Sequence, residues 1–245
     1  MKKFSPVKIK KFGEKAWLVS FEAVVSLDLL KNVKAYCQNL TEQFPKAIDV
    51  QNTYNSILIS YSNLAKTEKQ PTQDEVAEII KNTKIPEKIS TKRFELPVCY
   101  DQEFGIDLKE LAEEKNLDPK KVIQKHIEGN YTVFFTGFLP GFLYLGGLDK
   151  HLYHPRKAEP RLKVKKGSVG IAGNQTGIYP QESAGGWQII GNCPVNLFDS
   201  DKNPPVFCEP GDKLRFVPVS KTEHQKIKAS VENNSYTLKS ENYEF

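Results

Sequence analysis

The chain has 245 residues, 39% of them hydrophobic and 27% charged, which is typical of a globular protein with one large or two small domains. The net charge of +5, from 35 basic and 30 acidic residues, is unevenly placed, but neither half of the chain has the charge balance of a nucleic-acid-binding domain. Four cysteines are scattered without a C-x-x-C pair, so neither a disulfide framework nor a zinc ribbon is indicated.

The N-terminal segment is basic like the start of a secretory signal, but Glu14 and several lysines interrupt any apolar stretch there. No uninterrupted apolar run elsewhere approaches the length needed to span a membrane. We therefore expect a cytoplasmic protein.

The first ninety residues predict a small α+β unit with the pattern β-α-β-β-α. A strand is expected at residues 16–21, followed by a helix that Ser26 caps and Pro45 ends. Residues 47–61 predict two strands around an Asn-rich turn, and a capping box at residues 72–75 begins a second helix.

A polar, unpatterned stretch at residues 86–93 predicts a boundary between a domain of residues 1–90 and a second of residues 91–245. Beyond it, RFELPVCY alternates apolar and polar side chains like a half-buried strand. Asp107 and Asp118 are expected to cap two short helices, the second with Pro at its first position.

From Tyr131 onward the sequence predicts short strands and frequent turns, a pattern typical of a barrel or a sandwich. Residues 132–138 predict a strand that leads into a turn at 139–141. The segment EPGDKLRFVPV predicts a turn followed by an edge strand, because proline is tolerated at sheet edges. The many glycines between aromatic residues indicate positive φ angles or close approach of other groups.

The segment GSVGIAGNQTG is glycine-rich but has neither the G-K-[ST] ending of a P-loop nor G-x-G-x-x-G spacing. A nucleotide, if one takes part, is therefore expected elsewhere or at a shared interface. No serine lies in a G-x-S-x-G elbow and no cysteine has a local catalytic signature, so nucleophilic catalysis finds little support.

The four histidines suggest little metal chemistry. His126 lies on the apolar face of its predicted helix, as a satisfied core histidine or as a residue at the floor of a pocket. His151 and His154 could hold a metal on a helix, but the following proline disfavours helix at His154. His224 is expected to be solvated.

Two arginines in a basic stretch are candidate anion ligands. Arg156 and Arg161 each follow a proline, which stiffens the chain, and a guanidinium can grip a carboxylate or phosphate with two parallel hydrogen bonds. Two alternatives stay open: the stretch is a solvated strand and turn, or Arg161 pairs with an acid of the chain to hold the loop.

Four stretches carry a family resemblance: GFLPGFLYLGGL, PRKAEPR, GSVGIAGNQTGIYPQESAGGWQIIG and LFDSDKNPPVFCEPGDKLRFVPV. In order and spacing they resemble the family of the 5-oxoprolinase B subunit, also called PxpB or KipI and related to allophanate hydrolase subunit 1. The resemblance is strong over about residues 94–219 and looser before them. It implies an α+β protein, with a small α+β N-terminal domain followed by a cyclophilin-like β-barrel domain. The sequence departs from the family pattern at His154, Asn174, Gln181 and Ala184.

The resemblance also implies a function. The family works with the C and A subunits of 5-oxoprolinase in the ATP-dependent opening of the 5-oxoproline lactam to L-glutamate. The chain is thus expected to be inactive alone, with ATP at a site shared between subunits and no metal. Two alternatives remain: a regulatory binding module that inhibits a sporulation-type histidine kinase, and an allophanate hydrolase-like subunit.

Together, these observations name a candidate site. We expect the apolar segment of residues 135–149 to line one wall of the barrel's cleft, where Phe138, Phe142 and Tyr144 could pack a partner or a small substrate. The predicted polar residues are Arg156 and Arg161 as anion ligands, Gln175 as an orienting hydrogen-bond partner, and His126 and Glu182 as acid or base groups.

Overall fold

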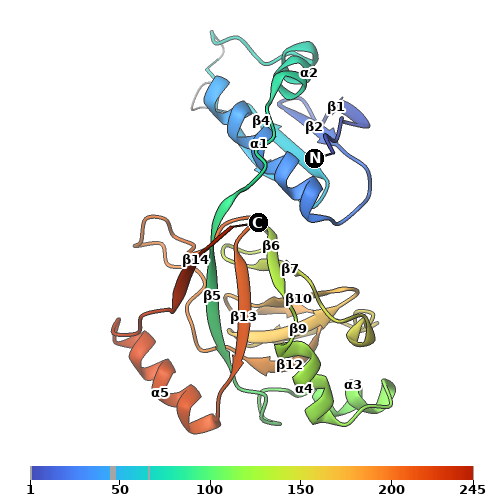
Figure 1. The fold of residues 1–245 in the computed structure, drawn as a ribbon. Helices are drawn as coiled ribbons and strands as arrows, with labels where there is room; N and C mark the ends of the chain where they lie inside the picture. Colours follow the sequence, from blue (N-terminus) through green and yellow to red (C-terminus); the bar gives the residue numbers. More distant parts are fainter. Residues whose placement is uncertain (1, 45–47, 66, 245) are drawn as a thin grey trace. The chain divides into compact units, whose positions relative to one another are not determined.

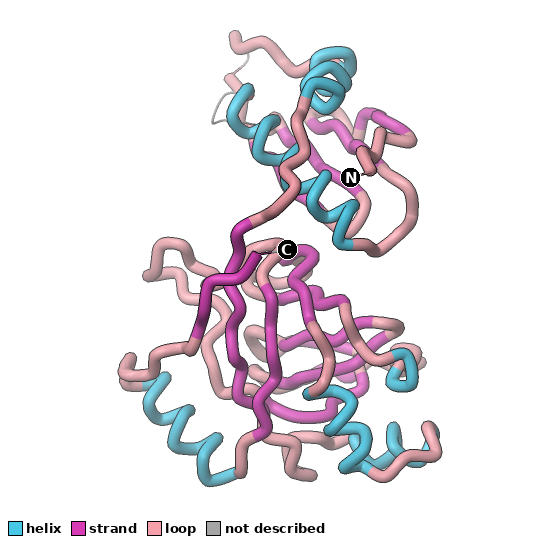
Figure 2. The backbone as a smooth tube through the Cα atoms, in the orientation of Figure 1, coloured by secondary structure: helices cyan, strands magenta, loops and turns pink. Residues whose placement is uncertain are grey.

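The computed structural model describes residues 2–44, 48–65 and 67–244. The chain divides into two compact units, Met1–Ile89 and Ser90–Phe245, each of which is described by itself (Figure 1). Both units combine helices with sheets, as Figure 2 shows, so the expected α+β class is confirmed. No helix within the described ranges is long and apolar enough to cross a membrane.

The N-terminal unit is a four-stranded antiparallel sheet in the order β1-β2-β4-β3, accompanied by two helices. The elements are β1 (Lys8–Lys11), β2 (Ala16–Ser20), α1 (Leu27–Gln43), β3 (Asp49–Asn52), β4 (Ser56–Ser60) and α2 (Gln73–Asn82). The prediction missed β1, whose sequence KIKK has a single apolar residue and therefore no readable alternation.

The helix starts of this unit follow from local hydrogen bonds. The Ser26 side chain accepts from the Leu29 N–H at the start of α1. At α2, Thr72 and Glu75 form the predicted capping box, with both reciprocal bonds present. Both capping predictions are confirmed, whereas the predicted helix stop at Pro45 lies outside the described residues.

The C-terminal unit contains an eight-stranded sheet in the order β12-β9-β10-β7-β6-β13-β5-β14, and a separate ribbon of β8 with β11. Its elements are β5 (Ser90–Val98), α3 (Leu108–Glu114), α4 (Pro119–Ile127), β6 (Tyr131–Thr136), β7 (Leu143–Gly146), η1 (Lys150–Leu152), β8 (Arg161–Val164), β9 (Ser168–Ala172), β10 (Gln175–Ile178), β11 (Ser183–Gly185), β12 (Gln188–Asn192), β13 (Lys213–Pro218), α5 (Lys221–Glu232) and β14 (Ser240–Glu244).

The terminal strand β12 touches the chain just after β5, which lies next to the other terminal strand, β14, at one point. Cys99, just after β5, and Asn192, the last residue of β12, exchange two backbone hydrogen bonds of 2.9 Å. One isolated bridge is not a continuous ladder, so the strand pairing does not show a closed sheet. The cyclophilin-like barrel that the resemblance implies stays a prediction.

The predicted edge strand before Pro218 is in fact an interior strand. β13 lies between β6, with which it is antiparallel, and β5, with which it is parallel. Pro218 is the last residue of β13, so its missing N–H interrupts nothing within the strand. The prediction was wrong because the position of a proline along a strand decides whether it forces that strand to an edge.

Two helix starts of this unit behave differently. Asp118 caps α4 through a bond from the Lys120 N–H, with Pro119 at the first helical position, as predicted. Asp107 occupies the N-cap position of α3, but its side chain makes no capping hydrogen bond. That prediction was wrong, because other groups of the chain bind the Asp107 carboxylate.

Apolar packing in the C-terminal unit forms a main core and a small second cluster. The second cluster is built from Phe142, Val164, Ala172, Tyr179, Trp187 and Ile189. Its members come from β7, β8, β9, β10, β12 and their flanking residues. Three of the six are aromatic, and this cluster forms the floor of the candidate site.

Candidate functional site

An aromatic cavity of about 220 Å³ lies over the second cluster. We call it the aromatic pocket; its lining is Phe138, Phe142, Tyr144, Arg156, Pro160, Tyr179, Ala184, Gly185, Gly186 and Trp187. The Phe142 ring meets those of Tyr179 and Trp187 edge to face, each at 5.4 Å between centroids. This geometry is favourable for aromatic pairs, so the rings hold one another in place.

Glycines allow these rings to come so close. A Cβ added to Gly185 would lie 2.2 Å from the Tyr179 hydroxyl oxygen, and one added to Gly177 would lie 3.0 Å from the Trp187 ring. Neither glycine has a positive φ, so their role is close approach rather than an unusual turn. Gly177 and Gly185 of the glycine-rich motif are therefore explained by the close packing of the rings of this pocket.

Arg156 supplies the positive charge of the aromatic pocket. Its guanidinium lies 5.9 Å from the centroid of the Trp187 ring, within the range of a cation–π contact. The side chain is exposed, and within residues 2–44, 48–65 and 67–244 no carboxylate pairs with it. An aromatic wall beside an unpaired guanidinium suits a small ligand that combines a flat body with a carboxylate.

Two tyrosines add hydroxyl groups to the same wall. Burial raises the pKa of Tyr144 and of Tyr179, although the nearby Arg156 charge partly opposes both shifts. Both phenols are therefore neutral at physiological pH, and each keeps its hydroxyl proton.

Arg161 is committed to an acid of this chain. Its guanidinium forms an ion pair with Asp107, whose carboxylate is buried, and the Lys157 ammonium lies 3.2 Å from the same oxygen. The other Asp107 oxygen accepts the Ile189 N–H at 2.7 Å. The sequence analysis left open that Arg161 pairs with an acid of the chain and holds the loop. The ion pair with Asp107 is such a contact.

Asp107 thereby joins the start of α3 to two segments that border the aromatic pocket. Arg161 also donates to the Trp187 carbonyl at 3.5 Å, and the Lys157 N–H donates to the Gly186 carbonyl at 2.7 Å. The carboxylate thus ties α3 to the loop before β8 and to the start of β12.

His126 is a core histidine. It is fully buried, and its two ring nitrogens lie 2.8 Å from the Tyr100 hydroxyl and 3.0 Å from that of Thr176. The Thr176 hydroxyl donates to the Gly170 carbonyl at 2.9 Å, so it accepts from Nε2–H, and Nδ1 accepts from Tyr100.

Burial holds His126 in its neutral form. Desolvation lowers its pKa to about 3, and the ring stacks on Phe216 at 4.5 Å. Its proposed acid or base role stays a prediction, and the observed hydrogen bonds occupy both nitrogens.

Gln175 and Glu182 lie on the surface side of the same unit. Gln175 is half-buried at the start of β10, opposite Ala172, and Glu182 is exposed, 3.5 Å from the Lys163 ammonium. The described lining of the aromatic pocket includes neither of them, nor His126. Arg156 and Arg161 thus both contact Trp187. The roles of Gln175, Glu182 and His126 stay predictions.

Sequence reasoning missed Tyr179, Trp187 and Asp107 as site residues. The two aromatics stand within the glycine-rich motif, where close-approach glycines beside aromatics were the available signal. Asp107 gave no such signal, because its partner Arg161 is 54 positions away and its N-cap position already offered a local explanation.

His224 is buried rather than solvated. Its Nε2 lies 2.8 Å from the Asn192 side-chain oxygen, and its ring packs on Phe104 at 4.4 Å. Within α5, Lys221–Glu232, it is the buried residue that docks an otherwise charged helix. The sequence signal was misread because the polar neighbours of His224 face water.

The glycine-rich segment does not fit a triphosphate. It forms the β9–β10 hairpin, in which Gly170 pairs with Gly177 across the ladder, so its backbone is engaged in the sheet. The described ranges also contain no cluster of three or more His, Cys, Asp or Glu side chains placed to hold a metal. We therefore derive no step of this chain's chemistry through ATP or a metal.

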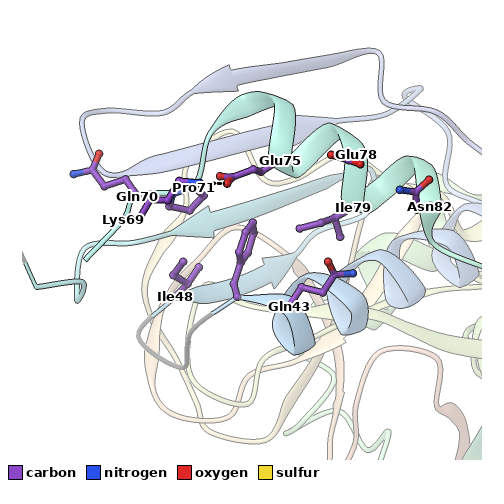
Figure 3. Close-up of a pocket in the computed structure, with 10 residues that line it drawn as sticks. Gln43, Ile48, Lys69, Gln70, Pro71, Glu75, Glu78, Ile79 and Asn82 are labelled. Carbon is purple, nitrogen blue, oxygen red and sulfur yellow. Dashed lines mark hydrogen bonds and ion pairs between the residues drawn. The ribbon is translucent and has the colours of Figure 1, made fainter. Parts of the chain in front are cut away.

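The N-terminal unit has a separate cavity of about 510 Å³ (Figure 3). Its described lining includes one cation, Lys69, which forms an ion pair with Glu75. Hydrogen bonds from Lys69 and Thr72 lower the pKa of Glu75 to about 2, so this acid serves the capping box and the ion pair. Among its described lining residues, the N-terminal cavity thus has neither an unpaired cation nor a wall of aromatic side chains.

Comparison with known proteins identifies relatives over nearly the whole chain. The B subunit of the Bacillus subtilis 5-oxoprolinase is 36% identical, covering 90% of this chain and 96% of that protein, and the B subunits of other bacterial 5-oxoprolinases also match. The family described as carboxyltransferase domain, subdomain C and D, matches residues 7–208.

Two solved structures place the fold. TTHA0988 superposes with a TM-score of 0.73 at 29% identity, covering 84% of this chain and 40% of that one, so this chain spans less than half of that protein. The urea amidolyase of K. lactis superposes with a TM-score of 0.82 at 19% identity, covering 98% of this chain and 16% of that one, which shows a shared fold. With the sequence matches, these findings show that the chain belongs to the family of the 5-oxoprolinase B subunit.

Proposed function

We propose that this chain is the B subunit of an ATP-dependent 5-oxoprolinase, which opens 5-oxo-L-proline to L-glutamate together with the A and C subunits. The observation that carries the proposal is the 36% identity to the B subunit of the B. subtilis 5-oxoprolinase over 96% of that protein. A match over nearly the full length of both chains supports a shared role rather than a shared module.

The aromatic pocket supports the same assignment. 5-Oxoproline is a small five-membered lactam ring with one carboxylate. We propose that its ring lies against Trp187 and Phe142 while Arg156 binds the carboxylate. Arg161 acts as a positioning residue in this proposal, because its guanidinium is held by Asp107 beside Trp187.

The proposal assigns ATP to a site beyond the described residues of this chain. Opening a lactam requires activation of a stabilised amide, and the glycine-rich hairpin does not fit a triphosphate. We propose that ATP binds on another subunit or at a shared interface, so the chain is inactive alone. A cytoplasmic place of action follows from the need for ATP.

We also propose a two-domain architecture: a small α+β domain, residues 1–90, and a cyclophilin-like barrel domain, residues 91–245. The single Cys99–Asn192 bridge supports the barrel, because it links the terminal strand β12 to the chain just after β5, near the opposite edge of the sheet. The proposed function does not depend on barrel closure.

Reconstitution tests the proposal directly. The purified chain is mixed with the A and C subunits, and glutamate release from 5-oxo-L-proline is measured with and without ATP. We expect ATP-dependent release by the three proteins together and none by this chain alone. Absence of glutamate release by the complete mixture would sink the proposal.

Two control reactions address the alternatives. Allophanate serves as a second substrate, because the fold is shared with a urea amidolyase. Autophosphorylation of a sporulation-type histidine kinase is measured with and without this chain. We expect turnover of 5-oxo-L-proline to exceed that of allophanate, and kinase activity to be unchanged.

A further inference from the structure

Phe138 has an unusual backbone for an aromatic residue. Its φ is 69°, in the left-handed region, whereas the two other described non-glycine residues with positive φ are Asn116 and Asn234. Asparagine tolerates this region, but a bulky side chain there carries a conformational cost. Glycine would adopt the same backbone freely, and the chain already has glycine at 137 and 141.

The side chain of Phe138 does little to offset that cost. It is 64% exposed, although phenylalanine is normally buried. The loop is closed without it, by hydrogen bonds from Phe142 N–H to the Leu139 carbonyl and from Gly137 N–H to the Phe142 carbonyl. The exposed ring is thus not required for the hydrogen bonds that close the loop.

The ring is nevertheless placed at the aromatic pocket. Phe138 belongs to its lining and meets Phe142 edge to face at 5.6 Å between centroids and 90° between planes. Phe142 in turn contacts Tyr179 and Trp187. The exposed ring therefore stands at the outer margin of an otherwise buried set of rings.

We propose that Phe138 closes the aromatic pocket over a bound small carboxylate ring, and that its strained backbone is retained for this contact. Residues with a strained backbone cluster at active sites and ligand-binding loops, where the strain serves the function. A ring over the ligand excludes water from the guanidinium–carboxylate pair and so strengthens it. This inference rests on the proposed function for the identity of the ligand.

The first test isolates the backbone strain in the free chain. Phe138→Gly and Phe138→Ala both remove the ring and differ in their tolerance of positive φ. We expect the glycine variant to melt about 2–4 °C above the alanine variant. Leu162 is the matched control, because it is 88% exposed on β8 and its φ is not positive. There the order should reverse, since glycine weakens a strand.

The second test measures the ligand contact in the reconstituted complex. Phe138→Ala and Phe138→Gly should both raise KM for 5-oxo-L-proline about tenfold, a loss typical of one aromatic contact, with a smaller change in kcat. Phe138→Tyr should restore most of the affinity, and Leu162→Ala should leave KM unchanged. Co-elution of the variants with the C subunit should match that of the wild type.

The outcomes separate this inference from the function on which it rests. A wild-type complex that releases no glutamate overturns the proposed function. An active complex whose KM is unchanged by Phe138→Ala overturns the closing role, as does an alanine variant that melts at or above the glycine variant. Loss of co-elution with unchanged KM would make Phe138 an interface residue between proteins of the complex instead, and would equally reject the proposal.

Discussion

The C-terminal unit contains two polar centres that differ in how far their groups are already used. At His126, both ring nitrogens and both neighbouring hydroxyls have partners inside the main core. At the aromatic pocket, Arg156 lies exposed over Trp187, without a carboxylate partner among the described residues. Both His126 and Arg156 were candidate site residues by chemical type. The polar groups around His126 are used by the fold, whereas the Arg156 guanidinium is available to a ligand.

Residue type alone therefore does not identify a site. A satisfied buried network stabilises the fold, and removing one member leaves an unpaired group at a cost of about 1–3 kcal/mol. An exposed guanidinium contributes little to folding and remains available to a ligand. Variants should accordingly separate into those that lower stability and those that lower affinity.

The largest expected effect is on stability, at Asp107, the buried acid that holds the segments beside the aromatic pocket together. Asp107→Ala should lower the free energy of unfolding by about 3 kcal/mol, because it leaves Arg161, Lys157 and the Ile189 N–H without their shared acceptor. Urea denaturation measures this loss. The control is Glu110→Ala, whose exposed carboxylate pairs with Lys157 and should contribute under about 1 kcal/mol. Equal losses in both variants would contradict the central role of Asp107.

The next effect is a pH dependence at His126. Its folded pKa is about 3 and its ordinary value is 6.5, so below pH 6.5 the unfolded chain takes up a proton that the folded chain does not. Above pH 6.5 this group does not lower the free energy of unfolding. Below pH 6.5 the free energy of unfolding falls by about 1.4 kcal/mol per pH unit, down to pH 3. Between pH 6.5 and 5 the wild type should therefore lose about 2 kcal/mol through this group.

His126→Gln tests that slope. The variant should be less stable than the wild type at pH 7, yet lose less stability on acidification, because the titrating group is gone. His154 and His224, whose pKa values burial also lowers, contribute equally to both proteins. Parallel curves for His126→Gln and the wild type would refute the assignment.

A smaller effect, on affinity, is expected at Arg156. Arg156→Lys keeps the charge and removes the planar fork, so KM for 5-oxo-L-proline in the reconstituted complex should rise about tenfold. The melting temperature should stay within about 1 °C, because the side chain is exposed. Lys163→Gln, which breaks an exposed pair with Glu182, is the surface-charge control. A marked fall in melting temperature at constant KM would make Arg156 structural.

The smallest effect is expected at Arg161. Arg161→Lys preserves a cation beside Asp107, so the free energy of unfolding should fall by about 1 kcal/mol or less, and KM should change less than threefold. Thermal unfolding and steady-state kinetics measure the two quantities. The opposite pattern, a tenfold rise in KM with unchanged stability, would show that Arg161 binds the substrate's anion directly.

Much of the local structure could be predicted because it depends on near neighbours. The caps at Ser26, Thr72 and Asp118 each join atoms two or three residues apart, so the sequence contains both partners in one short window. His126 was recognised as a core candidate from its place on an apolar helix face. The strand β14 and the helix α5 were missed, since both are largely polar and exposed.

The candidate site could be predicted only in part. Arg156, Phe138, Phe142 and Tyr144 were named from the sequence, and all four line the aromatic pocket. Tyr179 and Trp187 complete its wall from positions more than thirty residues beyond Phe138, Phe142 and Tyr144. Their convergence depends on the pairing of β7 with β10 and of β9 with β10 and β12, which no local pattern specifies.

By itself, the sequence determined the family, the α+β class and most helix starts, because motifs, periodicity and caps are read over short spans. The tertiary structure decided which charges are used and which stay open. Asp107 could have capped α3, but the fold places Arg161, Lys157 and the Ile189 N–H around it, and these bonds outweigh a local cap. Arg156, five residues before Arg161, meets no carboxylate among the described residues and so remains available to a ligand. Ion pairs between residues that are distant in the sequence form only after the chain has folded. This is why two arginines in one basic stretch have different roles.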